Sequence, residues 1–343
     1  MSRNMYLDAN AGIPEEYANA GNTYSKAGQI ANEALVSSSN MIRNIIGSPK
    51  DRLIITSGAT ESTTTAIHMI VHNYPCGAKF ILGPNNHPSV PIILEAKSIP
   101  YVVYNGKEKI EKIVDKSKIN IFIAPLVDSL TGRITPAKVL VRRMKKYGTT
   151  LFLCDATQAV GRYTFNRTSV AADFVSFSAH KFGGPKGIGG LLIRNIPDFE
   201  LVPLIPGSQQ DGLRGGTINV DGVVKTHAAL SLSLTDLDKK IRRTKSTIKR
   251  AYATLSEKFK IVNVKSIEDL DNTVGNILLI QTMSDAKDVA IQLAEAGYDV
   301  GTGYACSCGE SNLIRVSIQM GSTDSLDGFC EKLIELADWH DVK

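Results

Sequence analysis

The feature that most constrains the fold is a repeated pattern in the first two hundred residues, where strand-length apolar runs alternate with helix-like stretches. The runs lie in the segments DRLIITSGAT, AKFILGPNNH, KINIFIAPLVDS, TTLFLCDATQ and DFVSFSAHK, and small or polar residues follow each of them at once. Helical candidates at residues 60–73 and 136–147 lie between them. This alternation is typical of an α/β domain with a mostly parallel sheet.

The residues that follow these runs are expected to lie close together. In open α/β sheets, ligands bind in the crevice beyond the carboxyl ends of the strands. A hydroxyl, an imidazole, a carboxylate and a lysine would meet there. The residues concerned are Thr60, His87, Asp128, Ser129, Asp155, Gln158, Ser178, His180 and Lys181.

After about residue 237 the pattern changes to that of a smaller α+β domain. A charged amphipathic helix candidate, DLDKKIRRTKSTIKRAYATLSEKFK, precedes two apolar runs and a final helix over residues 325–339. We expect a large domain at 13–237 and a small one formed by 1–12 and 238–343. The 343 residues, 43% of them hydrophobic, are enough for both cores.

The charge and hydropathy of the chain exclude several classes of partner. Lysine and arginine number 39 against 34 acids, an excess too small to indicate nucleic-acid binding. A basic helix near 239–250 could contact RNA, but a solvated face is favoured. No apolar run approaches the ~20 residues of a membrane span, and the start lacks a secretory signal. We expect a cytoplasmic protein.

The five cysteines are an odd number, which argues against a disulfide framework. Cys76, Cys154 and Cys330 lie among apolar or turn residues and are expected to be inert. Cys306 and Cys308, in VGTGYACSCGES, lie in a small and polar segment where a thiolate could act. Two cysteines alone make a poor metal site, so we expect no metal.

Lys181 has a setting that a surface lysine does not need, between an apolar strand and the glycine-rich run FGGPKGIGG. A lysine that forms a Schiff base needs a fixed position and a lowered pKa. Pyridoxal phosphate also needs an acid for its ring nitrogen, phosphate donors and a stacking partner. Asp155, the SGAT turn with Ser178 and His180, and His87 offer these groups.

Two of these features, taken alone, are also compatible with a purely structural role. The turn at Gly58 before a helix that starts near Thr60 is an anion site, but a simple N-cap without a ligand would have the same sequence. Asp155 at a strand end needs a partner, and a structural hydrogen bond or a helix cap would also provide one.

Six segments together resemble the cysteine desulfurases, a group of the class V aminotransferases with the pyridoxal-phosphate (PLP) fold type I architecture. They are TSGATES, NNHPSV, DATQAVG, SFSAHKFGGPKGIGG, GLRGGT and IRVS, in the order and approximate spacing of that family. The most specific element is DATQ followed at this distance by S-x-H-K. The resemblance runs from YLDANA to IRVSIQ, nearly the whole chain.

The resemblance implies a role for each motif residue around the cofactor. Lys181 would hold PLP as an aldimine, Asp155 would pair with the pyridine nitrogen, and Gln158 with the ring hydroxyl. His87 would stack on the ring and move protons. The remaining cofactor residues would hold the phosphate, and they are Ala59, Thr60, Ser178, His180 and, across the interface of a homodimer, Thr217.

The resemblance also implies the substrate and the product. Arg315, in NLIRVS, and Asn10, in YLDANA, would bind L-cysteine, the arginine through its carboxylate. Cys306 would attack the substrate sulfur and keep it as a persulfide while alanine leaves. The acceptor stays open: an iron–sulfur scaffold, a tRNA-thiolation enzyme or another carrier.

Two positions depart from the family pattern. Ser129, next to Asp128, stands where the family has an asparagine facing the cofactor, so we place Ser129 in the site as a weaker donor and expect Asp128 to point elsewhere. Only eight residues separate Cys306 from Arg315, so their loop spans at most about 30 Å. We therefore expect an acceptor or activator to come to the cleft. Cys308 could receive sulfur, bind a metal or cluster, or be inert.

Two alternatives remain on the residues alone. The first is another PLP reaction, that of a selenocysteine lyase or a class V aminotransferase. The second is a non-catalytic protein on the same fold that binds a partner or tRNA through the basic helix.

Overall fold

The structure, a computed structural model, describes residues 16–303 and 312–340 and divides into two compact units. Unit 1 comprises the described residues up to Ala124 and Pro136–Thr235. Unit 2 comprises Pro125–Thr135 and the described residues from Asp236 onward. The division falls two residues before the boundary expected at 237, and the segment 125–135, expected in the large domain, groups with unit 2. Residues 1–12, assigned to the small domain, lie outside the described residues.

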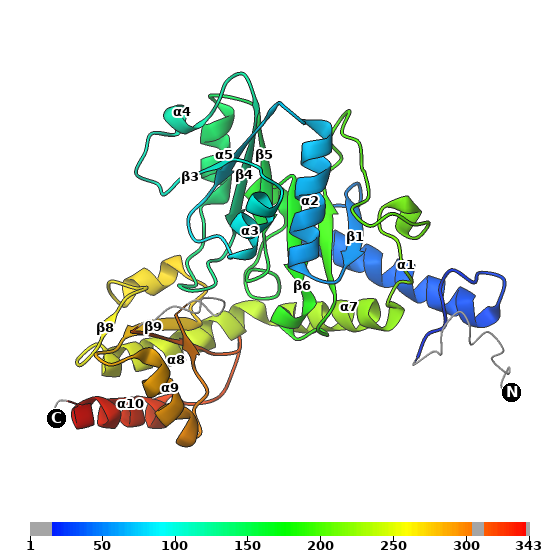
Figure 1. Cartoon of the computed structure of the whole chain (residues 1–343). Coiled ribbons are helices and arrows are strands. Elements are labelled where there is room, and N and C mark those ends of the chain that lie inside the picture. Colours follow the sequence, from blue (N-terminus) through cyan, green and yellow to red (C-terminus); the bar gives the residue numbers. More distant parts are fainter. Residues whose placement is uncertain (1–15, 304–311, 341–343) are drawn as a thin grey trace, which may run out of the picture. The chain divides into compact units, whose positions relative to one another are not determined.

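Unit 1 is built on a seven-stranded sheet with the order β1-β7-β6-β5-β4-β2-β3 (Figure 1). The pairs β2–β3, β2–β4 and β5–β6 are parallel, and β7 is antiparallel to both of its neighbours, β1 and β6. This mostly parallel sheet confirms the predicted α/β class. The strands are β1 (Arg52–Thr56), β2 (Ala78–Leu82), β3 (Tyr101–Val103), β4 (Ile119–Pro125), β5 (Thr150–Asp155), β6 (Phe174–Ser178) and β7 (Gly189–Ile193).

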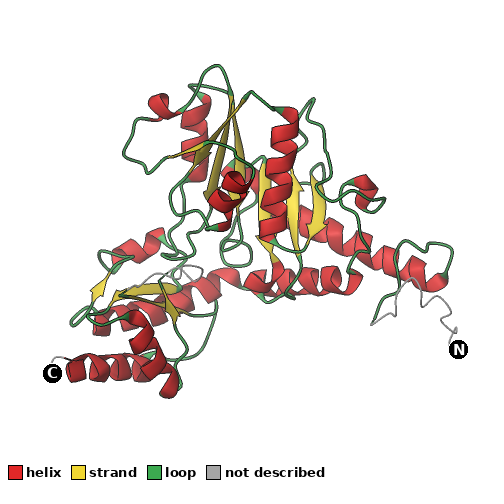
Figure 2. Ribbon diagram, in the orientation of Figure 1, coloured by secondary structure: helices red, strands yellow, loops and turns green. Residues whose placement is uncertain are grey.

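Helices cover this sheet. Strands β6 and β7 are buried along their whole length, as expected for strands covered on both faces. Helix α2 packs on β5, β6 and β7, while α1 packs on α7 (Figure 2). The helices of unit 1 are α1 (Lys26–Ile46), α2 (Ala59–Asn73), α3 (Ser89–Ala96), α4 (Ile110–Ile113), α5 (Ala137–Lys145), α6 (Arg167–Val170) and α7 (Val220–Leu234), with 3₁₀ turns η2 (Ala179–Phe182) and η3 (Gln210–Gly212).

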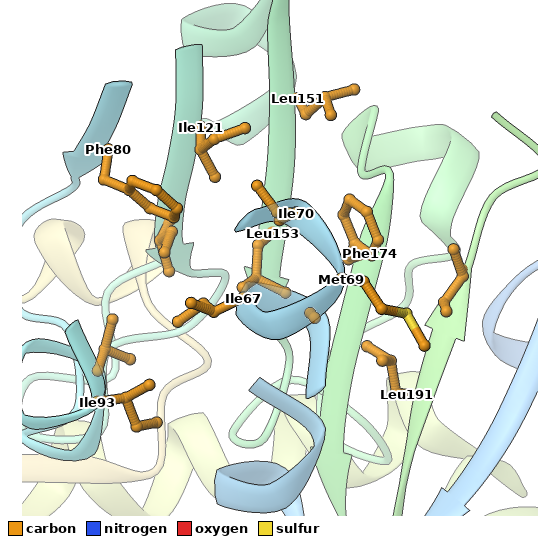
Figure 3. Close-up of a cluster of buried hydrophobic side chains, with 14 of the residues drawn as sticks. Ile67, Met69, Ile70, Phe80, Ile93, Ile121, Leu151, Leu153, Phe174 and Leu191 are labelled. Atoms are coloured by element: carbon orange, nitrogen blue, oxygen red, sulfur yellow. The ribbon is translucent and has the colours of Figure 1, made fainter. Parts of the chain in front are cut away.

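The core of unit 1 lies between α2 and the sheet. Ile67 and Ile70 of α2 are fully buried against apolar side chains of the strands, among them Leu153 and Phe174 (Figure 3). Each fully buried side chain of this size stabilises the fold by about 1.5–3 kcal/mol relative to leaving it in water. This contact fixes the start of α2 next to the ends of the strands, where the candidate site lies.

Unit 2 has a four-stranded antiparallel sheet with the order β10-β11-β9-β8. Its strands are β8 (Lys260–Ile261), β9 (Ile277–Gln281), β10 (Gly301–Thr302) and β11 (Leu313–Ser317), and its helices are α8 (Leu237–Leu255), η4 (Glu268–Asn272), α9 (Ala286–Glu295) and α10 (Asp327–His340). Asn263 ties the segment 125–135 to this unit, because its amide nitrogen donates to the carbonyl oxygens of Thr131 and Ile277. None of the helices in the described ranges is long and apolar enough to cross a membrane.

Candidate active site

The end of β6 contacts the start of α2 through alternate residues of the strand. Phe174 belongs to the core beneath α2, Ser176 Oγ accepts a hydrogen bond from Thr63 Oγ1 at 3.2 Å, and Ser178 Oγ accepts one from the backbone N–H of Ala59 at 2.8 Å. The period of two along a strand therefore places two serines on the α2 side. Ser178 keeps its own hydroxyl proton for another acceptor.

The helix start has the backbone features of an anion site. Gly58, at φ 155°, is the N-cap residue of α2 and has no side chain to cap the helix, so the hydroxyl of Ser178 is the side-chain acceptor at the first turn. A β-carbon at Gly58 would lie 3.2 Å from Ser178 Oγ, so only glycine lets the turn approach the serine this closely without strain. Thr60 is exposed in the first turn. Ala59, Thr60 and Ser178 thus surround the positive end of a helix dipole.

An ion pair lies beside this turn, and the sequence did not reveal it. Arg214 donates to both carboxylate oxygens of Glu61, at 3.0 and 3.3 Å, and the backbone N–H of Ser57 donates to Glu61 Oε2 at 2.7 Å. The Glu61 side chain is 11% exposed. This pair connects the start of α2 to the GLRGGT segment, in which Thr217 is exposed.

The Glu61 pair predicts an acid-sensitive contribution to stability. Burial raises the pKa of Glu61, but hydrogen bonds from Arg214 and Ser57 and the Arg214 charge outweigh burial and hold the pKa below its ordinary value of 4.5. A carboxyl whose pKa is lowered on folding stabilises the fold above its unfolded pKa and loses this contribution as the pH falls through its folded pKa. We expect the loss of stability caused by Glu61→Gln to be largest above pH 4.5 and to shrink below it. Unfolding midpoints of both proteins between about pH 3 and 7 measure this, and a constant difference across the range would contradict it.

Asp155 ends β5 and keeps one carboxylate oxygen for a ligand. Its Oδ1 accepts the backbone N–H of Thr157 at 2.9 Å, and in the described part of the chain Oδ2 accepts nothing. Thr157 Oγ1 is buried and also lacks a partner there. A half-buried carboxylate oxygen and a buried orphan hydroxyl next to each other indicate that a polar ligand belongs at this strand end.

Gln158 and Lys181 are joined by Arg162, which no sequence motif singled out. Arg162 Nη1 donates to Gln158 Oε1, and Arg162 Nη2 donates to the carbonyl oxygen of Lys181 at 2.5 Å. Lys181 lies in η2, which follows Ser178 directly, and is half-buried. The structure therefore brings Gln158, Ser178 and Lys181 together in unit 1.

Two histidines were predicted to face the cofactor. His87 Nδ1 lies 2.8 Å from Ser89 Oγ and accepts the backbone N–H of Ser89 at 3.2 Å, and these contacts fix the orientation of the ring. His180 is exposed in η2. Burial lowers the pKa of His180, and the charges of Lys181, Lys186 and Arg162 lower it further. The lowered pKa favours the neutral form of His180 near pH 7.

In unit 2, Ser129 and Arg315 lie in contact. Arg315, in β11, donates from Nη1 to the carbonyl oxygen of Ser129 at 3.3 Å, and its Nε is buried without a partner among the described residues. Asp128 accepts the backbone N–H groups of Leu130 and Thr131 with its Oδ1, at 2.7 and 3.2 Å. Asp128 thus stabilises its own turn, which is a structural role.

A family model described as aminotransferase class-V matches residues 8–325. The chain belongs to this family. Among curated members, the cysteine desulfurase IscS of Dictyoglomus turgidum is 30% identical over 334 residues, which cover 90% of this chain and 83% of that protein. The IscS of Anaeromyxobacter dehalogenans is 27% identical over 322 residues, which cover 91% and 79%.

Solved structures of similar proteins share the fold. A structure described as a NifS-like protein superimposes with a TM-score of 0.84 at 25% identity and covers 95% of this chain and 93% of its own. The apo cysteine desulfurase of Thermococcus onnurineus NA1 superimposes with a TM-score of 0.79 at 21% identity, with coverages of 92% and 86%. This confirms the PLP fold type I architecture predicted from the sequence.

Members of the class-V family use PLP, and the described residues fit that group. The helix start at Ala59 suits a phosphate, and the open oxygen of Asp155 suits a ring nitrogen. The orphan hydroxyl of Thr157 is available to a further polar atom. Asn10, Cys306 and Cys308 lie outside the described residues.

The three described cysteines differ in exposure. Cys76 is exposed, whereas Cys154 and Cys330 are buried. Burial, with Asp155 close by, raises the pKa of Cys154. Burial, together with Asp327 and Glu331, raises the pKa of Cys330 to about 11. Both shifts favour the protonated thiol near pH 7, and a thiol is a much weaker nucleophile than a thiolate.

Proposed function

We propose that the protein is a PLP-dependent cysteine desulfurase that moves sulfur from L-cysteine to Cys306 and releases L-alanine. The observation that carries the proposal is the position of Lys181. Lys181 follows the end of β6, where Ser178 Oγ accepts the backbone N–H of Ala59 at the start of α2. Its own carbonyl oxygen accepts a hydrogen bond from Arg162, which also donates to Gln158 in the loop that follows Asp155. Family membership and high coverage of named cysteine desulfurases support the same reaction.

In this proposal each described residue has one task. The Lys181 amine would hold the cofactor covalently, Asp155 Oδ2 would accept the ring N–H, and the Gln158 amide would donate to the ring hydroxyl. Bound PLP supplies the electron sink that makes the carbon–sulfur bond of the substrate breakable. His87 would face the ring and move protons, and the contact of its Nδ1 with Ser89 would hold the imidazole in place.

The second part of the proposal concerns the residues that would bind the PLP phosphate, one of which would come from the other subunit of a homodimer. The phosphate would accept hydrogen bonds from the region of Ala59, Thr60, Ser178 and His180, with Thr217 of the other subunit of a homodimer. The exposure of Thr217 and the link from Arg214 to Glu61 support a role at an interface.

The substrate would be bound by Arg315 and Asn10, with Ser129 as a further donor. The buried, unpartnered Nε of Arg315 supports this, because a guanidinium edge of this kind suits a carboxylate. The Cys306 thiolate attacks the sulfur of L-cysteine. A sulfur–sulfur bond forms, the carbon–sulfur bond breaks, and protons complete alanine, so that the products are alanine and the Cys306 persulfide.

The short loop around Cys306 indicates how the sulfur acceptor would reach the persulfide. With eight residues between Cys306 and Arg315, the persulfide is not carried far, so a cytoplasmic acceptor or activator protein comes to it. Iron–sulfur cluster assembly and tRNA thiolation are the two uses that fit such a donor.

Cys306→Ser separates this function from the alternatives. We expect the wild type, incubated with L-cysteine, to gain one sulfur atom that maps to Cys306, and to form alanine. The Cys306→Ser variant should keep the absorbance of bound PLP but lose the persulfide and fall at least about a hundredfold in alanine formation, because the nucleophile is gone. Intact-protein and peptide mass spectrometry measure this.

Cys308→Ser is the matched control, and it should retain the persulfide on Cys306. Sulfide and alanine formation that survives in Cys306→Ser would favour a selenocysteine lyase or another PLP reaction. A wild type that binds no PLP would favour the non-catalytic protein.

A further inference from the structure

Arg162 is a half-buried cation with an unusual set of partners. Its two terminal nitrogens donate to Gln158 Oε1 and to the Lys181 carbonyl oxygen, and it takes part in none of the ion pairs formed by the described residues. Burial lowers the pKa of Arg162. Even partial burial of a guanidinium against neutral oxygens alone has a cost in free energy, so a role beyond packing is expected.

The contact with Arg162 decides which way the Gln158 amide faces. A guanidinium has donors and no acceptor, so Gln158 must present its oxygen to Arg162. The amide nitrogen then faces away from Arg162, and it donates to no acceptor among the described residues. The Gln158 amide is thereby oriented as a donor to a ligand at the end of β5.

The second contact of Arg162 fixes the turn that carries Lys181. Gly161, at φ 74°, lets the Gln158 loop approach this turn, because a β-carbon at Gly161 would lie 2.6 Å from Phe182 Cβ. The charge of Arg162 also reaches the turn, since it contributes to lowering the pKa of His180. Arg162 therefore acts on the lysine turn through both a hydrogen bond and a charge.

We propose that Arg162 is a positioning residue of the cofactor site, which orients the Gln158 amide toward the cofactor ring and holds the Lys181 turn against the Asp155 loop. The proposal rests on the proposed function, because it needs PLP at this site. Arg162 itself does not contact the substrate or the cofactor; it acts through Gln158 and Lys181.

The test compares Arg162→Met and Arg162→Lys with a matched control, Arg142→Met. Arg142 is an exposed arginine on α5. The dissociation constant of PLP from the apoprotein is measured by fluorescence. Losing hydrogen bonds from a charged donor should weaken PLP binding roughly 10-fold to 100-fold in Arg162→Met. Arg162→Lys should recover part of this affinity, and Arg142→Met should bind like the wild type.

A pH titration of the visible absorbance of bound PLP separates positioning from folding. Removing a neighbouring positive charge raises the pKa of a cationic group, so the midpoint should shift to higher pH in Arg162→Met. In Arg162→Lys the midpoint should stay near that of the wild type, because the charge is kept. Thermal unfolding of each apoprotein reports any effect on the fold alone.

A double-mutant cycle tests the route through Gln158. The effects of Arg162→Met and Gln158→Ala on PLP affinity should be clearly less than additive, because both remove the same oriented donor. Additive effects, or a wild-type midpoint in Arg162→Met, would overturn the proposal while the proposed function stands. A wild type without the PLP absorbance would overturn both.

Discussion

Replacing Lys181 with alanine is expected to abolish the covalent binding of PLP and to lower alanine formation from L-cysteine by about 1,000-fold or more. The amine is the only group in the site proposed to bind the cofactor covalently, and the loss of such covalent catalysis costs orders of magnitude in rate. Borohydride reduction followed by peptide mapping should label the Lys181 peptide of the wild type and leave the variant unlabelled.

Lys186→Ala is the matched control for this experiment. Lys186 lies five residues further along the same glycine-rich segment and is exposed, so its removal should leave the label and the visible absorbance in place. A Lys181→Ala protein that still bound PLP covalently, or a label on Lys186 in the wild type, would contradict the assignment of Lys181.

The main strands of unit 1 could be predicted because each apolar run is short and bounded by polar residues. The runs that end at Thr56, Asp155 and Ser178 are β1, β5 and β6 in the structure. Strand β7 could not be predicted, because its glycine-rich start lowers strand propensity. The structure shows why glycines stand there: a β-carbon at Gly189 would lie 2.3 Å from the carbonyl oxygen of Phe177, so the close pairing of β6 and β7 excludes any other residue.

The site residues at strand ends could be predicted, but the residues that orient them could not. Glu61 and Arg214 are 153 residues apart, and Arg162 is joined to the Lys181 carbonyl across 19 residues. Each is an ordinary charged residue in its local sequence, so pattern and propensity carry no sign of the contact. A buried charge is recognised only once the fold shows which neighbours it has.

The attachment of the segment 125–135 to unit 2 also could not be predicted. This segment continues directly from β4, and the chain shows no change of composition there. It is attached by two side-chain contacts, from Asn263 to the Thr131 carbonyl and from Arg133 to Asp269 at 2.5 Å, and by an isolated antiparallel bridge between Arg133 and Thr273. Such contacts join residues that are far apart in the sequence, and the periodicity of apolar residues does not reveal them.

The buried ion pair of Asp51 and Arg167 gives the largest expected effect on stability. Arg167 Nε donates to Asp51 Oδ2 at 2.7 Å, and the backbone N–H of Ser48 donates to the same oxygen at 2.8 Å. Asp51 is 5% and Arg167 8% exposed. Arg167→Met leaves a carboxylate buried without its cation, and we expect the free energy of unfolding to fall by about 3–5 kcal/mol.

A neighbouring ion pair of unit 1 offers a control with the same substitution. Arg52 pairs with Asp211, but these side chains are 40% and 81% exposed. Because water screens such a pair, Arg52→Met should cost only about 0–1 kcal/mol. Urea unfolding of the apoprotein, followed by circular dichroism, compares the two variants. Adding Asp51→Asn to Arg167→Met should recover part of the loss, because the uncompensated charge is then removed. Equal, small losses for both arginines would show that solvent reaches Asp51 and that its burial does not govern the stability of unit 1.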